Sequence, residues 1–234
     1  MSSEMIDVTQ LPEYPAASEA DLAAVEIEQK VLSVKLSSMT VEIYSQQTAP
    51  SGGSPKLTVL LLHGMSFTSQ NWVDIKTLQN LALWGFRAVA IDLPGYGKSK
   101  NEALGPVSNE EFMAAVVSLL QIKPVIISPS MSGGFALPYL FEDPLQSTEK
   151  AIGYIPVAPV LTANWEQNYP KSQLPTLIVY GSRDERLGFA SRDSLKVLPA
   201  SQIAEIPDAG HACYMNQPAL FHNLLYWFLN KLSA

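Results

Sequence analysis

Three serines stand close together in PVIISPSMSGG, residues 124–134, where an apolar run ends and a helical pattern begins. A serine at a sharp turn between a strand and a helix can be exposed as a nucleophile, provided that the residues two before and two after it are small. Ser130 meets this condition, with Ser128 and Ser132 in the places that glycine usually fills. The segment therefore predicts Ser130 as a nucleophile for acyl transfer.

The two neighbouring serines are weaker candidates. Ser128 has the branched residue Ile126 two places before it, which would collide at such a turn. Ser132 passes the size test but requires the strand to continue through Pro129, which has no N–H for the ladder. Ser132 stays open as an alternative nucleophile, and the segment could also be a serine-rich strand end without catalytic meaning.

An acid and a base follow two later apolar runs, Asp184 in LIVYGSRDE and His211 in IPDAGHAC. A serine hydroxyl becomes nucleophilic when an imidazole accepts its proton, and a carboxylate fixes the tautomer of that imidazole. We therefore predict His211 as general base and Asp184 as the acid that orients it. Asp208 is a rival acid, but it lies three residues before His211, where a turn role is more natural. His222 falls in a helical pattern, and we expect it to be solvated.

A second strand end contributes backbone donors. LLLHGMSF, residues 60–67, ends a buried strand at His63 and Gly64, after which the chain can turn back over the serine. This predicts that the N–H groups of Met65 and Met131 form an oxyanion hole for a tetrahedral intermediate. The alternative is a simple turn at the end of the strand.

Two further motifs receive no catalytic role. DLPGYGKS, residues 92–99, resembles a phosphate loop, but the glycine that a Walker A motif needs five places before Gly97 is replaced by Asp92. We interpret it as a glycine-rich turn. Cys213 is the single cysteine, so it cannot form an internal disulfide. It could be sensitive to oxidation, but we expect an inert thiol.

The N-terminal part of the chain differs from the rest. Residues 1–24 are acidic and contain prolines and serines without a clear period, which predicts a poorly ordered lead-in. Residues 25–45 alternate loosely and break at 37–39, which indicates an antiparallel hairpin. A connector at 50–56 follows. We expect residues 25–234 to form one domain.

After the connector, short apolar runs alternate with helical patterns. This alternation is typical of a mostly parallel sheet with helices on both faces, an α/β fold. The expected strands are 58–63, 86–93, 124–128, 151–157, 176–181 and 201–207. The expected helices are 70–83, 108–121, 132–142, 187–196 and 217–231. Between two strands, residues 160–175 leave room for only a minimal lid.

Composition limits the partners. The 234 residues are 47% apolar, which favours one well-buried core, and they carry a net charge of −7. That charge gives no long-range attraction to nucleic acid or to an anionic membrane. Apolar runs are far shorter than the roughly 20 residues that span a bilayer, and no export signal is evident. We expect a cytoplasmic protein that binds neither nucleic acid nor membrane.

Several segments together carry a family resemblance. They are VLLLHGMSF, FRAVAIDLPGYGKSK, FMAAVV, VIISPSMSG, PVAPV, LIVYG with the following Asp184, and AGHACY. With these the chain resembles the α/β-hydrolase superfamily and, within it, the abhydrolase-domain-containing 14 family, especially its B type (CIB-like). The likeness spans Val59 to Tyr214 and leaves residues 1–24 outside. The serine-proline-serine-x-serine turn is unusual among hydrolases, which makes it more specific than a G-x-S-x-G match.

The resemblance implies a function. It assigns the nucleophile to Ser130, the acid to Asp184 and the base to His211. It implies enzymes of the cytoplasm and nucleus that cleave small acyl esters, need no metal and no required cofactor, and can pass an acetyl group from a protein lysine to coenzyme A. Arg183 and Arg192 could hold the phosphates of coenzyme A or be solvated charges. A transcription-associated protein partner is also implied. The rival hypothesis is a hydrolase scaffold without turnover that acts as a protein-interaction module.

Overall fold

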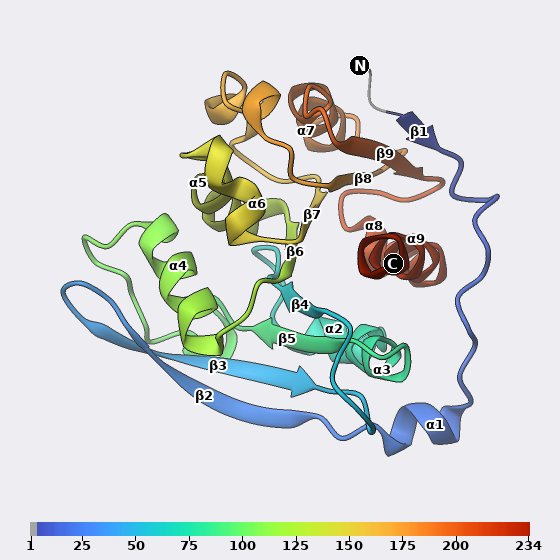
Figure 1. Ribbon diagram of the computed structural model, residues 1–234, viewed down its shortest axis with the longest axis horizontal. Coiled ribbons are helices and arrows are strands. Elements are labelled where there is room, and N and C mark those ends of the chain that lie inside the picture. The colour runs from blue at the N-terminus through green and yellow to red at the C-terminus, as the bar shows by residue number, and fades with distance from the viewer. Residues whose placement is uncertain (1–3) are drawn as a thin grey trace.

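The computed structural model describes residues 4–234. Within this range nine strands form one sheet in the order β1-β9-β8-β7-β6-β4-β5-β3-β2 (Figure 1). The strands are β1 (Glu4–Ile6), β2 (Glu28–Lys35), β3 (Thr40–Thr48), β4 (Thr58–Leu61), β5 (Arg87–Ile91), β6 (Val125–Pro129), β7 (Gly153–Val157), β8 (Thr176–Gly181) and β9 (Ser201–Ile206).

One strand, β3, runs opposite to all the others. β3 pairs antiparallel with β2 and with β5, whereas the neighbours from β5 to β1 are parallel. β6, β7 and β8 are buried along their whole length, as expected for central parallel strands covered on both faces. The predicted mostly parallel sheet with an N-terminal antiparallel hairpin is confirmed, and the hairpin turns at residues 36–39.

Helices cover both faces of this sheet (Figure 1). The helices are α1 (Glu19–Ala24), α2 (Gln70–Asp74), α3 (Thr77–Leu83), α4 (Asn109–Leu120), α5 (Gly133–Phe141), α6 (Ser147–Lys150), α7 (Leu187–Leu195), α8 (Cys213–Asn216) and α9 (Pro218–Ser233). Apolar residues of α4, α5 and α7 share one core cluster, and those of α2, α3, α8 and α9 share a second. Two cores separated by one sheet give the three layers of an α/β fold.

Two helix predictions can be compared in detail. The predicted helix 70–83 is wrong as one element, because Lys76 adopts a left-handed backbone conformation (φ 64°) that separates α2 from α3. The predicted start of α4 is confirmed, since the Ser108 hydroxyl accepts a hydrogen bond from the backbone N–H of Glu111.

The N-terminal strap, defined here as residues 4–24, differs from the poorly ordered lead-in that was predicted; residues 1–3 of that lead-in lie outside the described range. β1 pairs parallel with β9, and α1 begins with a capping box at Ser18. Between them Val8 is buried and the backbone N–H of Tyr14 donates to Asn223 of α9 (2.9 Å). These anchors are single residues without a period, so the sequence pattern did not show them.

The segment 160–175 between β7 and β8 holds only two short 3₁₀ turns, Thr162–Trp165 and Tyr169–Lys171. The predicted minimal lid matches this arrangement. Across the described part of the chain, no helix combines the length and apolar character needed to cross a bilayer.

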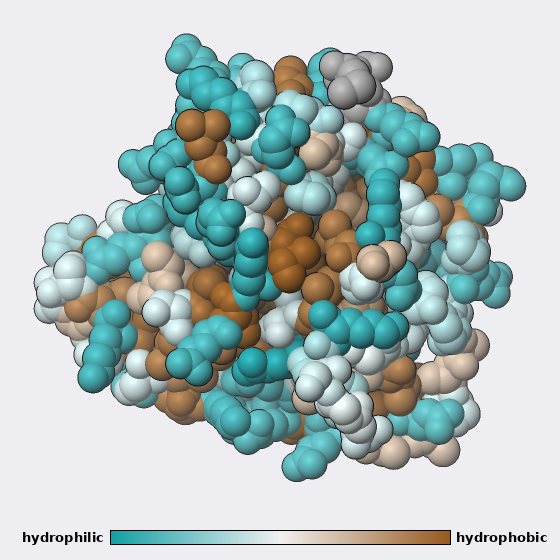
Figure 2. Space-filling view, in the orientation of Figure 1, coloured by the Kyte–Doolittle hydropathy of each residue, from teal (hydrophilic) through white to brown (hydrophobic). Residues whose placement is uncertain are grey.

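Figure 2 shows the face of the molecule on which the C-terminal end of α9 lies, with apolar side chains gathered in its middle and polar ones around them. Near that end, Leu232 packs beside Gly153, the first residue of β7. This face therefore holds the amino ends of the parallel strands. The residues predicted to do chemistry follow the carboxyl ends, at the opposite edge of the sheet.

Candidate active site

Ser130 stands at a sharp turn between β6 and α5. Its backbone has φ 49°, a left-handed conformation that a non-glycine residue rarely adopts. The turn is tightly enclosed: a Cβ on Gly133 would lie 2.6 Å from Pro159, and one on Gly64 would lie 3.7 Å from the Cβ of Ser130. This strained, crowded turn matches the predicted geometry that exposes a nucleophile.

The structure separates the three serines by their hydrogen bonds. The Ser128 hydroxyl is buried against the hydroxyl of Tyr154 (2.7 Å), and that of Ser132 is buried and donates to the carbonyl of Pro129 (2.8 Å). β6 does continue through Pro129, so the argument made from the sequence against Ser132 is wrong. Its buried hydroxyl, bonded to the backbone, disfavours it instead.

The Ser130 hydroxyl faces an imidazole. His211 Nε2 lies 2.8 Å from Ser130 Oγ, and His211 Nδ1 lies 2.6 Å from Oδ2 of Asp184. The carboxylate is 8% exposed, whereas the imidazole side chain is 44% exposed. A buried carboxylate that accepts from Nδ1–H leaves Nε2 free to accept the serine proton. The chain of three groups can therefore activate the hydroxyl.

Two loops bring the acid and the base together. Asp184 follows β8, and His211 follows β9, the adjacent strand. Gly181 permits their approach, because a Cβ there would lie 2.3 Å from the carbonyl oxygens of Ala209 and Gly210. Any side chain at residue 181 would push the two loops apart.

The rival acid Asp208 has the turn role that was expected. Its backbone is left-handed (φ 56°), its N–H donates to the hydroxyl of Ser182 (2.9 Å), and its carboxylate pairs with Arg183 (2.6 Å). Both partners of that ion pair are largely exposed. Asp184, and not Asp208, carries the bond to His211.

The expectation of a solvated His222 is wrong. Its side chain is buried between α9 and α3, 2.9 Å from Thr77 Oγ1 and 3.4 Å from Asn80 Nδ2, and burial lowers its pKa to about 4. Helical spacing offered a signal, because His222 lies three residues before Leu225 on the apolar face of α9.

His63 holds the start of the loop that carries Met65. The Nδ1–H of His63 donates to the carbonyl of Gly64, and its Nε2 accepts the backbone N–H of Leu93, both at 2.9 Å. Burial lowers the pKa of His63, which favours the neutral ring that these two bonds require. Met65 follows Gly64, which lies close to the Cβ of Ser130, and Met131 directly follows Ser130. The backbone N–H groups of Met65 and Met131 therefore belong to two segments beside the serine. Their role as an oxyanion hole stays a prediction.

Asp92, which stands where a Walker A motif would have glycine, has a structural role that the sequence pattern did not predict. Its buried carboxylate accepts the backbone N–H groups of Ser69 and Lys98, each at 2.7 Å, and so ties the turn 92–99 to the start of α2. A Cβ on Gly97 would lie 2.2 Å from Asp92 Oδ2. The glycine-rich turn therefore closes around a carboxylate of its own chain.

The remaining candidates have other partners. Arg183 pairs with Asp208, and Arg192 pairs with Asp193 and lies over the rings of Tyr180 and Phe189. A role for Arg183 or Arg192 toward coenzyme A remains a proposal. Cys213 is fully buried, and burial raises the pKa of its thiol to about 12, which disfavours the reactive thiolate.

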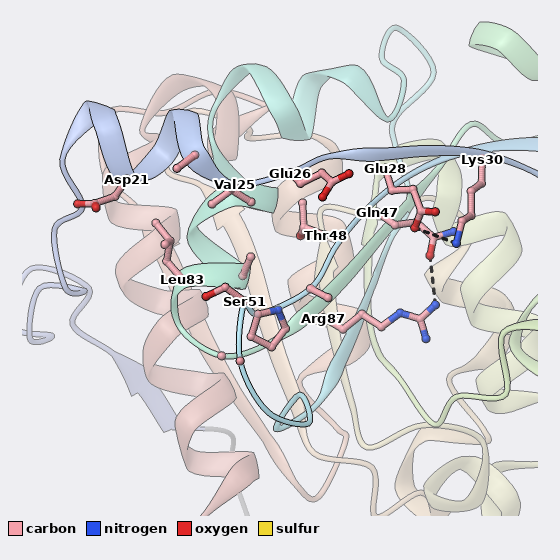
Figure 3. A pocket seen from close by; sticks show the side chains of 16 residues that line it. Asp21, Val25, Glu26, Glu28, Lys30, Gln47, Thr48, Ser51, Leu83 and Arg87 are labelled. Carbon is pink, nitrogen blue, oxygen red and sulfur yellow. Dashed lines mark hydrogen bonds and ion pairs between the residues drawn. The ribbon is translucent and has the colours of Figure 1, made fainter.

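A groove of about 1200 Å³ lies away from Ser130, between the strap, the start of β2 and the end of α3 (Figure 3). Its charged side chains are of both signs: Asp21, Glu26, Glu28, Lys30 and Arg87. Lys30 is paired with Glu28, and Arg87 donates to Gln47. No cluster of three or more potential metal ligands occurs among residues 4–234.

Comparison with known proteins identifies the family. Residues 59–137 match the model described as the Alpha/beta hydrolase family. The human protein named "Putative protein-lysine deacylase ABHD14B" is 41% identical over 197 residues, which cover 82% of this chain and 91% of the relative. The rat ABHD14B is 41% identical over 212 residues, covering 86% and 99%. The chain belongs to the ABHD14 family of α/β hydrolases.

Other members and structures agree with this assignment. The zebrafish (Danio rerio) protein ABHD14A is 41% identical over 183 residues, covering 76% of this chain and 66% of that relative. A crystal structure described as a predicted CIB-like hydrolase from Thermoplasma acidophilum superposes with a TM-score of 0.75 at 22% identity, covering 89% of this chain and all of that one. The structural likeness shows the α/β-hydrolase fold, and the sequence likeness shows the ABHD14 family.

Proposed function

We propose that this ABHD14 family member is a serine hydrolase or acyltransferase that works through an acyl-Ser130 intermediate. One observation carries the proposal: the hydrogen-bonded chain from Ser130 Oγ to His211 (2.8 Å) and from His211 to Asp184 (2.6 Å), with a left-handed backbone at Ser130. An isolated serine, histidine or aspartate has many structural uses, but this geometry is what acyl transfer requires.

The proposed reaction has two halves. In the first, Ser130 Oγ bonds to the acyl carbonyl carbon while His211 Nε2 takes the hydroxyl proton, and the N–H groups of Met65 and Met131 donate to the oxyanion. The bond to the leaving group then breaks, and the leaving group takes the proton from His211. In the second half, an acceptor gives its proton to His211 and bonds to the acyl carbon, the bond from that carbon to Ser130 Oγ breaks, and His211 returns the proton to the serine oxygen. Asp184 holds the imidazole in one tautomer throughout.

Two observations support the proposed substrate class: the names of the relatives and the small lid. ABHD14B carries "protein-lysine deacylase" in its name, and we extend that substrate class, an acyl-lysine peptide or a small acyl ester, to this chain. Residues 160–175 form only short turns, which leaves room for a peptide-borne acyl group. The acceptor is water or the thiol of coenzyme A, and the compartment is the cytoplasm or nucleus.

Labelling with a fluorophosphonate tests the nucleophile. The wild-type protein should be labelled, Ser130→Ala should lose the label, and the matched variant Ser132→Ala should keep it. An unreactive wild-type protein would favour a scaffold without turnover. A label that survives Ser130→Ala and disappears in Ser132→Ala would move the nucleophile to Ser132.

Mass spectrometry tests the substrate and the acceptor. After addition of an acetyl-lysine peptide, we expect a mass increase of one acetyl group on the tryptic peptide that contains residue 130. Coenzyme A should discharge this adduct and yield acetyl-coenzyme A if the thiol is the acceptor. No adduct and no acetylated thiol would remove the transferase branch.

A further inference from the structure

Two exposed apolar side chains flank Ser130 from opposite neighbours in the sheet. Met65 follows β4 and is 67% exposed, and Leu161 follows β7 and is 55% exposed. Each is one residue away from a contact with Ser130: Gly64 lies against the serine Cβ, and the N–H of Val160 donates to the serine carbonyl (3.0 Å). β6, which Ser130 directly follows, pairs with both β4 and β7.

Leu161 has an unfavourable backbone conformation and an exposed apolar side chain. Its backbone is left-handed (φ 63°), where glycine or asparagine would be less strained, and its large apolar side chain is turned to solvent. The loop is fixed on either side of it, because Val160 bonds to Ser130 and the hydroxyl of Tyr169 donates to the carbonyl of Thr162 (2.8 Å). Strain together with exposure has no benefit for folding and points to binding.

Leu161 lies beside the start of α5, the helix that follows the serine turn. Its Cδ1 would lie 3.6 Å from a Cβ on Gly134, in the first turn of α5 directly after the serine turn. Met65, in the segment after β4, has a flexible, unbranched and exposed side chain that can adapt to ligands of different length. An acyl chain bound to Ser130 Oγ would therefore leave the serine between two apolar side chains.

We propose that Met65 and Leu161 form an apolar rim that holds the alkyl chain of the acyl group, so that the enzyme prefers aliphatic acyl groups of several carbons over acetyl. The inference rests on the proposed acyl-Ser130 mechanism and names the substrate class of that site. Each methylene that the rim removes from water should raise kcat/KM about fourfold.

The test is the chain-length profile of the full-length protein with p-nitrophenyl acetate, butyrate and hexanoate. For the wild type, kcat/KM for hexanoate should exceed that for acetate. Leu161→Asn, which suits the left-handed backbone, should lower the hexanoate-to-acetate ratio by about tenfold. Met65→Ala should lower it in the same direction.

Leu145→Asn is the matched control. Leu145 is 72% exposed in the turn Pro144–Gln146, which precedes β7 at the amino edge of the sheet, away from Ser130. This control should keep the wild-type ratio. The rate of fluorophosphonate labelling in each variant shows that the serine turn is still assembled.

Two results would overturn the rim: a wild type that prefers acetate, or a Leu161→Asn ratio equal to that of the wild type. Failure of the mechanism has a different signature. If Ser130→Ala hydrolyses all three esters as fast as the wild type, the acyl-Ser130 proposal fails.

Discussion

The side chains of Ser130, His211 and Asp184 form one hydrogen-bonded chain. Asp184 and Asp208 both lie near His211 in the sequence or in the structure, but only one of them bonds to its ring. Asp184 is buried and bonded to the ring, whereas Asp208 lies in the same loop as His211 and pairs with an exposed arginine. Proximity in sequence therefore favours one aspartate, and the hydrogen bonds favour the other.

Replacement of each aspartate separates the two roles. Asp184→Asn should lower kcat by about 10³- to 10⁴-fold, because an amide can stabilise neither the required tautomer nor the imidazolium. Asp208→Asn removes the same charge from an exposed position and should change kcat less than about threefold. Steady-state ester hydrolysis measures both, and equal losses would contradict the assignment of Asp184.

His222 makes the free energy of unfolding depend on pH. Its pKa is about 4 in the folded state and near 6.5 when unfolded, so between these values the unfolded chain binds more protons. This contribution to stability is complete above pH 6.5 and declines as the pH falls toward 4, by up to about 3 kcal/mol.

Urea denaturation at pH 7 and pH 4.5 measures this decline. His222→Gln keeps hydrogen-bonding capacity toward Thr77 and removes the titrating ring, so the variant should lose less stability between the two pH values than the wild type. An identical loss in both proteins would mean that other groups determine the pH dependence.

At the scale of elements, loops after four parallel strands build the site: those after β4, β6, β8 and β9 carry Met65, Ser130, Asp184 and His211. The turn 92–99 after β5 supports them indirectly, because Asp92 holds the amide of Ser69. A change in this turn should therefore affect stability first.

Gly97→Ala tests the closure of that turn. The new Cβ would lie 2.2 Å from the Asp92 carboxylate at a residue with φ 50°, so we expect a loss of about 3 kcal/mol in the free energy of unfolding. Gly105→Ala is the matched control, since its φ is 56° and nothing lies within 4 Å of the Cβ, and it should cost about 1 kcal/mol. Chemical denaturation measures both, and equal costs would show that φ alone decides.

Most of the strands, and the site residues at their ends, could be predicted from the sequence for a physical reason. Strands buried on both faces must be almost wholly apolar, so β4 to β8 stood out, whereas polar Gln202 and Glu205 interrupt β9. The ends of these strands marked Ser130, Asp184 and His211. The division between α2 and α3 was not readable, because lysine gives no sign of a left-handed backbone. The continuation of β6 through Pro129 and the anchors of the strap depend on tertiary contacts that no local pattern encodes.

At the scale of the molecule, the strap runs from β1 beside β9 along the outside of the protein to α1 near α3 (Figure 1). Midway, the Tyr14 ring makes edge contacts with Trp84 and His222, at centroid distances of 5.3 and 5.5 Å. The strap therefore covers the contact between α3 and α9.

Tyr14 variants measure what this cover contributes. Tyr14→Ala removes the ring contacts and should lower the free energy of unfolding by about 1–2 kcal/mol. Tyr14→Phe keeps the ring and should stay within about 0.5 kcal/mol of the wild type. Ester hydrolysis should be unchanged in both, because Tyr14 packs against α3 and α9 and not against the serine turn.

β1 (Glu4–Ile6) pairs with the outer edge of β9. Without β1, the backbone N–H and C=O groups on that edge would be unpaired and could bind a strand of another polypeptide. A protein shortened to begin at residue 7 would lose β1 but keep Tyr14, and it would expose the backbone N–H and C=O groups along Gln202–Ala204. Such a shortened protein should self-associate at concentrations where the full chain does not, and size-exclusion chromatography of both would reveal it. The three residues of β1, far from the candidate active site, can therefore determine whether the protein self-associates.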